Sequence, residues 1–150
     1  MKYIKEYNEY IDPFNEDDWN EVEPDGSFLA WLKSKYPDEN TWKDLTMIGC
    51  SNQNLTDLIG IDKLINLIYL SCRYNQLTEL DVSENINLEH LYCENNQLTK
   101  LDVTKNIKLK YLCCEYNQLT ELDVTKNVNL IDLYCKNNQL KELDIRRILI

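Results

Sequence analysis

The sequence predicts an α/β solenoid, in which similar turns stack and each adds one short strand to a parallel sheet, behind a small helical N-terminal cap. The first observation is a repeat: residues 88–108, LEHLYCENNQLTKLDVTKNIK, recur with few changes at 67–87, 109–129 and 130–150. A more divergent copy of 22 residues occupies 45–66. The second observation is the spacing L-x-x-L-x-C-x-x-N-x-L within the copies. The chain therefore divides into a cap, residues 1–44, and five repeats, residues 45–150.

Each copy contains one strand and one turn whose residues have separate tasks. Strand alternation points Leu91 and Cys93 inward, with Leu98 beyond them, so that residues 88–93 form a short parallel strand. An asparagine follows three residues after the cysteine in four copies, where its side chain satisfies buried backbone groups of its own and the next turn. These residues are Asn75, Asn96, Asn117 and Asn138, and Gln53 replaces them in the first copy.

This pattern resembles the leucine-rich repeat family, with cysteine at the third apolar position. The 21-residue copies, with L-D-V-x-x-N, are similar to short bacterial repeats, and LTDLIGIDKLINL in the first copy is similar to the 22-residue internalin type. The resemblance covers residues 45–150 and implies a curved, right-handed solenoid with a short parallel β-sheet on its concave face. It implies no chemistry, because function depends on the site and not on the fold.

Most of the cysteines occupy one repeat position. We expect buried free thiols that pack as small apolar side chains. Strands about 4.8 Å apart would permit disulfides on distance alone, but a row of five leaves one cysteine over. The row consists of Cys50, Cys72, Cys93, Cys114 and Cys135.

The 44 residues before the repeats predict a cap for the open end of the solenoid. Residues 2–11 have apolar side chains at helical spacing, and residues 27–36 form the clearest helix, which begins at the polar Ser27 and ends before Pro37. Trp31 and Trp42 are interpreted as packing residues of this cap, with a ligand-binding pair as the alternative. Between the two helices lies an acidic segment without basic residues: Asp12, Glu16, Asp17, Asp18, Glu21, Glu23 and Asp25.

The formal net charge of −10 argues against direct binding of nucleic acid or of an anionic membrane, which needs a basic surface. The acidic segment allows an alternative function, an inhibitor of phage or viral origin that blocks a basic nucleic-acid-binding host protein. A solvated loop that keeps the protein soluble is the other interpretation of this segment.

The outward-facing strand positions predict a recognition surface on the concave face. Tyrosine is common in such surfaces because it offers a large amphipathic area at low rotamer entropy, although aromatic residues also favour strands in general. We therefore expect a non-catalytic module that binds a partner protein, with solvent-facing contact residues. The predicted contact residues are Tyr69, Arg73, Tyr74, His90, Tyr92, Tyr111, Tyr116, Asp132 and Tyr134.

The sequence predicts no enzyme, no metal and no cofactor. His90 and Cys113 share a face, but one strand spacing across and two residues along separates their Cα atoms by about 8 Å, too far for a preset nucleophile and base. Asp132 lies two strands from His90. The aspartates of the L-D-[VI] triplets are expected to cap backbone amides of the following turn, since no repeat supplies the further oxygen ligands of a calcium site. They are Asp81, Asp102, Asp123 and Asp144.

Two expectations concern location and assembly. The sequence contains no signal segment and no apolar run long enough for a membrane span, so we expect a cytoplasmic protein, in the host cytoplasm if the chain is viral. The last repeat ends in Ile148, Leu149 and Ile150 without a capping helix. Either this tail folds back over the last repeat, or two molecules form a homodimer through their C-terminal repeats.

Overall fold

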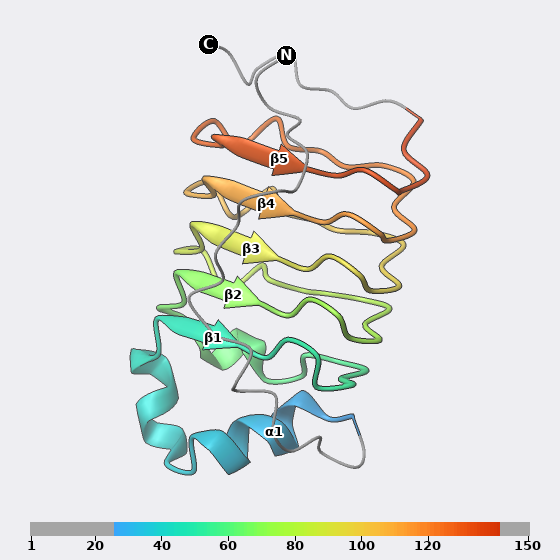
Figure 1. Ribbon diagram of the computed structural model, residues 1–150. Coiled ribbons are helices and arrows are strands. Elements are labelled where there is room, and N and C mark those ends of the chain that lie inside the picture. The colour runs from blue at the N-terminus through green and yellow to red at the C-terminus, as the bar shows by residue number, and fades with distance from the viewer. Residues whose placement is uncertain (1–25, 142–150) are drawn as a thin grey trace.

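The computed structural model describes residues 26–141 (Figure 1). The predicted helix at 2–11, the acidic segment and the C-terminal tail with Asp144 lie outside these residues. The described elements are α1 (Phe28–Lys35), the 3-10 helix η2 (Glu39–Asp44), β1 (Met47–Gly49), the 3-10 helix η3 (Ile61–Lys63), β2 (Tyr69–Ser71), β3 (His90–Tyr92), β4 (Tyr111–Cys113) and β5 (Asp132–Tyr134).

The five strands form one parallel sheet in sequence order, β1 to β5, with one strand for each turn of the chain (Figure 1). The register aligns the middle residue of every strand with that of the next, and all five middle side chains are fully buried. They are Ile48, Leu70, Leu91, Leu112 and Leu133. The predicted fold class, a solenoid with a short parallel sheet, is therefore confirmed.

Helix α1 lies at the β1 end of the stack (Figure 1). Its first turn is capped as predicted, because the Ser27 hydroxyl oxygen accepts a hydrogen bond from the backbone N–H of Ala30 at 3.3 Å. Trp31 and Trp42 are 4% and 1% exposed and belong to the hydrophobic core, so they pack as cap residues. Trp42 also donates its indole N–H to the carbonyl of Tyr36 at 2.7 Å.

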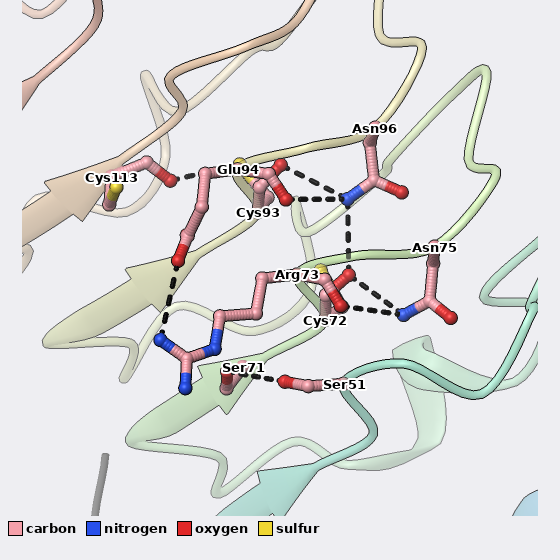
Figure 2. A network of polar contacts seen from close by, with 9 residues as sticks. All are labelled: Ser51, Ser71, Cys72, Arg73, Asn75, Cys93, Glu94, Asn96 and Cys113. Carbon is pink, nitrogen blue, oxygen red and sulfur yellow. Dashed lines mark hydrogen bonds and ion pairs between the residues drawn. The ribbon is translucent and has the colours of Figure 1, made fainter. Parts of the chain in front are cut away.

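The predicted asparagine row bonds buried backbone groups as expected, but these groups belong to its own and the preceding turn, not to the next one. The Asn96 amide donates to the carbonyls of Cys72 and Cys93, both at 3.1 Å, and its Oδ1 accepts from the backbone N–H of Leu77 at 3.0 Å. Each asparagine thus joins its own turn to the preceding one, as Figure 2 shows for Asn96. Gln53 does not reproduce this pattern, because its amide donates only to Ser51 within the same turn.

The structure adds a second asparagine row that the sequence analysis did not single out. It lies before the strands, in the final N of D-V-x-x-N, and its side chains are fully buried. Asn106, for example, donates to the carbonyls of Val82 and Asn85, both at 3.0 Å. The row consists of Asn85, Asn106 and Asn127.

The aspartates of the return segment act as caps, as predicted. Asp81, Asp102 and Asp123 each accept a hydrogen bond at 2.9 Å from the backbone N–H two residues later. The backbone N–H of Ser83 stabilises the charged Asp81 carboxylate and lowers its pKa. For Asp102 the hydroxyl of Thr104 lowers the pKa most, followed by the Thr104 backbone N–H. The five cysteines of the predicted row are free and buried, which agrees with their interpretation as packing residues, and Cys113 is free and buried as well.

Candidate functional site

The outward positions of the strands come together as one surface, which we call the tyrosine face: Tyr69, His90, Tyr92, Tyr111 and Tyr134. The parallel register places Tyr69 beside His90 and His90 beside Tyr111. It also places Tyr92 beside Cys113 and Cys113 beside Tyr134. Asp132 of β5 is paired with Tyr111 of β4. Six of the nine predicted contact residues therefore lie on four neighbouring strands, β2 to β5.

Four rings of the tyrosine face, those of Tyr69, His90, Tyr92 and Tyr111, contact one another along the sheet. The rings of His90 and Tyr111 are almost parallel and stacked, with centroids 4.7 Å apart and an interplanar angle of 12°. Tyr69 lies 5.5 Å from Tyr92 and 5.8 Å from His90, centroid to centroid. Aromatic pairs at these distances attract each other beyond the area that they bury, so the rings are held in place by their neighbours.

The expectation that all these positions face solvent is wrong. Tyr69 is 5% and Tyr92 3% exposed, Cys113 is fully buried and Asp132 is 9% exposed. Part of this burial comes from the rings themselves, because a strand spacing of about 4.8 Å is narrower than a tyrosine side chain is long, and Tyr69, Tyr92 and Cys113 form a buried cluster of their own. Only His90, Tyr111 and Tyr134 keep intermediate exposure on this face.

The remaining predicted contact residues, Arg73, Tyr74 and Tyr116, follow the strands at one edge of the face. Tyr74 and Tyr116 are 49% and 55% exposed. Both have positive φ, 55° and 52°, a conformation that asparagine adopts at the equivalent positions 52, 95 and 137. Arg73 directs its guanidinium toward Glu94, with Nη1 3.5 Å from Oε1, as Figure 2 shows.

Sequence reasoning missed two carboxylates beside these residues, Glu94 and Glu115. They are 3% and 5% exposed, and burial raises the pKa of both carboxyls. Their position directly after the cysteine row was the available signal, because the same position holds Arg73 in the preceding turn and Lys136 in the last one. Because glutamate is rarely buried, the residue type itself does not predict this position.

The Cys113 thiol and the His90 imidazole of this face are not arranged as an activated nucleophile and its base. Burial raises the pKa of the Cys113 thiol far above its ordinary value, so that the thiol stays protonated near neutral pH. Burial also lowers the pKa of His90, whose ring is stacked on Tyr111. The segment proposed as an acidic site, residues 12–23, lies outside the described residues.

Three comparisons relate the chain to known proteins. The profile of a family described as leucine rich repeats (2 copies) matches residues 65–106 and 86–126. Internalin J of Listeria monocytogenes is 40% identical over 74 residues, which are 45% of this chain and 8% of that protein. The match thus spans a small part of that relative.

Solved structures agree with the sequence comparison. The functional domain of InlJ from Listeria monocytogenes, which includes a cysteine ladder, superposes with a TM-score of 0.71 at 46% identity, covering 73% of this chain and 24% of that one. A leucine-rich repeat protein of Leptospira interrogans gives a TM-score of 0.63 at 28% identity, covering 67% of this chain and 28% of that one. Internalin C2 of Listeria monocytogenes shares the fold, with a TM-score of 0.66 at 24% identity. The superposition covers 70% of this chain and 49% of that one. Within residues 26–141, no helix has the length and apolar character needed to cross a bilayer.

Proposed function

Because the chain is an internalin-like leucine-rich repeat protein, we propose that it is a non-catalytic module that binds a partner protein through the tyrosine face and its edge. Leucine-rich repeat proteins generally mediate protein–protein interactions, and the sequence resemblance predicts that this sheet lines the concave side. The contact residues remain those predicted from the sequence, now with different weights: His90, Tyr111 and Tyr134 on the strands, and Tyr74 and Tyr116 at the edge.

The observation that best supports this proposal is the stacked row of rings across β2, β3 and β4. Within this row, Tyr69 and Tyr92 are buried, and His90 and Tyr111 beside them remain partly exposed. Rings that are already held by neighbours lose little rotamer entropy when a partner binds. Partly exposed tyrosines held by neighbouring rings are therefore suited to be the central contacts of an interface.

The test is affinity capture with matched variants. The parent protein, Tyr111→Ala and Thr120→Ala are immobilised at equal density, and the proteins that they capture from a cell lysate are compared quantitatively. Thr120 is exposed outside the strands, so its variant controls for non-specific capture. We expect Tyr111→Ala to reduce capture of a specific partner at least tenfold, as loss of a central aromatic contact of about 2 kcal/mol does, and Thr120→Ala to leave it unchanged. Equal capture by all three proteins would refute the proposal.

Salt elution separates this function from the alternative inhibitor of a basic protein. A partner held by aromatic contacts resists elution by salt, whereas a partner held by the acidic residues of segment 12–23 elutes as ionic strength rises. No observation on the described residues favours the alternative, and it stays a hypothesis from the sequence. The cytoplasmic location and the homodimer through the C-terminal repeat also stay predictions.

A further inference from the structure

One row of charged residues crosses the edge of the tyrosine face. The backbone ladder continues beyond the strands, because Tyr74 N donates to Glu94 O, Asn95 N to Glu115 O and Tyr116 N to Lys136 O, at 3.0, 3.0 and 3.1 Å. Arg73, Glu94, Glu115 and Lys136 thus occupy the same position in four successive turns. Neighbouring turns are about 4.8 Å apart, so the two glutamates are adjacent.

A hollow of about 450 Å³ opens beside this row. Glu94, Asn95 and Glu115 line it, together with the exposed rings of Tyr74 and Tyr116 and with Lys136. Tyr74 and Tyr116 come from turns that are two apart, with Asn95 between them. The hollow therefore combines two carboxylates with two aromatic rings.

The Glu94 carboxylate in the hollow has only weak partners. Glu94 is 3% exposed, and its two oxygens have no well-formed hydrogen bond within residues 26–141. Arg73 approaches Oε1 at 3.5 Å, and the other side-chain partner of the carboxyl is the Cys113 thiol, a weak donor. For Glu115, burial outweighs the favourable influence of Lys136, so the pKa of its carboxyl is also raised. A buried carboxylate is costly until an opposite charge or hydrogen-bond donors reach it.

One cation of this chain, the guanidinium of Arg73, already lies beside the Glu94 carboxylate and the Tyr74 ring. The guanidinium of Arg73 lies over the ring of Tyr74, 5.9 Å from its centroid, and faces the Glu94 carboxylate. A cation over an aromatic face and beside a carboxylate is stabilised by both. One turn further, Glu115 and Tyr116 also line the hollow and supply a second carboxylate and a second ring.

We propose that this hollow binds the cationic side chain, ammonium or guanidinium, of a lysine or arginine on the partner protein. This inference rests on the proposed protein-binding function and specifies the chemistry of the partner's central contact. The cation would enter between Tyr74 and Tyr116 and donate to Glu94 and Glu115, while Asn95 offers a further polar contact. A calcium ion fits less well, because two glutamates and one asparagine supply fewer oxygen ligands than calcium takes.

The test uses short peptides that differ in one group. Acetyl-Gly-Arg-Gly-amide and acetyl-Gly-Lys-Gly-amide carry the cation, and acetyl-Gly-citrulline-Gly-amide has the shape of the arginine peptide without the charge. Each is titrated into the full chain, and binding is followed through the backbone amide shifts of Tyr74, Asn95 and Tyr116. We expect at least one cationic peptide to bind with a Kd in the millimolar range, at least tenfold tighter than the citrulline peptide. A parallel titration with calcium chloride tests the metal as occupant.

Three variants locate the site. Glu94→Gln combined with Glu115→Gln removes both charges at constant shape, and we expect cation binding to weaken at least tenfold. Tyr116→Asn, which places at the turn the residue found at the equivalent position 95, should weaken it about threefold, as loss of one cation–π contact does. Glu121→Gln removes an exposed carboxylate outside the hollow and should change nothing. If the double variant fails to fold, Tyr116→Asn still tests the site.

Three results would overturn the inference: equal binding of the arginine and citrulline peptides, no saturable binding of either cationic peptide at 100 mM, or shifts that calcium alone produces. The peptide titration does not involve the partner, so its outcome is independent of the capture experiment. Capture that depends on Tyr111 together with no peptide binding would retain the proposed function and remove only this cation site. Peptide binding without Tyr111-dependent capture would retain the cation site and remove the proposed function of the tyrosine face.

Discussion

The cysteine row and the row of residues directly after it in the sequence differ in how much the residue type varies from turn to turn. The cysteine row, from Cys50 to Cys135, has the same residue in every turn and is buried throughout. The row directly after it changes from turn to turn and contains opposite charges: Ser51, Arg73, Glu94, Glu115 and Lys136. Both rows repeat with the same geometry, because the backbone ladder runs through them without interruption.

The difference separates what stacking requires from what it leaves open. Every turn offers the core the same small space, which a cysteine fills as a weakly polar, compact side chain. At the next position the side chain leaves the core, so packing no longer selects one residue, and charge and ring size can vary. Variation at fixed geometry is therefore where a binding surface is expected on this fold.

The largest effect is expected in the repeated interior. Asn96→Ala removes the bonds to Leu77, Cys72 and Cys93 and leaves buried backbone groups unpaired. We expect the free energy of unfolding to fall by about 3 kcal/mol, at roughly 1 kcal/mol or more for each buried group. Urea denaturation measures the change. Asn129→Ala is the matched control, because Asn129 makes one exposed bond, to Ile107 at 2.9 Å, and a loss as large as that of Asn96→Ala would contradict the assignment.

A smaller loss is expected at a buried ring of the tyrosine face. Tyr92 is 3% exposed and packs on Tyr69, so Tyr92→Ala should lower the free energy of unfolding by about 2 kcal/mol, at the lower end for large buried side chains. Tyr116→Ala, at 55% exposure, should cost well under half as much. Thermal and urea melts of both variants test this order. If the two variants were equally stable, the varied face would contribute nothing to the fold.

The buried glutamate predicts a change of stability with pH. Burial raises the pKa of Glu94 in the folded state above its ordinary value of 4.5, so protonation favours the folded chain. The stabilisation by this proton is complete below pH 4.5 and is lost as pH rises through the folded-state pKa. After burial itself, the interactions with Arg73 and Cys113 set the pH at which that happens. In denaturation series between pH 4 and 8, Glu94→Gln should gain stability over the parent as pH rises, and parallel curves would contradict the prediction.

The smallest expected effect is a gain in stability from a substitution at the edge of the tyrosine face. Tyr116 adopts φ 52°, where asparagine stands in three equivalent turns. Asparagine tolerates this left-handed conformation better than tyrosine, so Tyr116→Asn should raise the free energy of unfolding by about 0.5 kcal/mol. The thermal midpoint measures it, with Gln118→Asn, outside the left-handed positions, as the control. A lower midpoint for Tyr116→Asn would mean that the ring contributes packing that offsets its strain.

The interior of the solenoid was predictable from local spacing. The 21-residue period fixed which residues align, and Asn75, Asn96 and Asn117 could be assigned to backbone bonding because each recurs beside the same buried turn. The second row, Asn85, Asn106 and Asn127, carried the same periodic signal and was overlooked. The Ser27 cap of α1 could be predicted from the sequence of the first helical turn alone.

By itself the sequence determined the period, the parallel stacking, the buried cysteine row and the capping aspartates, because each depends on contacts that repeat identically in every turn. Only the tertiary structure decided how far the outward residues are exposed. Alternation gives the side of the sheet to which Tyr92 points, but its burial depends on the size of its neighbours on other strands, 21 residues away in the chain. The pairing of Arg73 with Glu94 and the hollow between Tyr74 and Tyr116 follow from the same cross-strand distances, which no single turn contains.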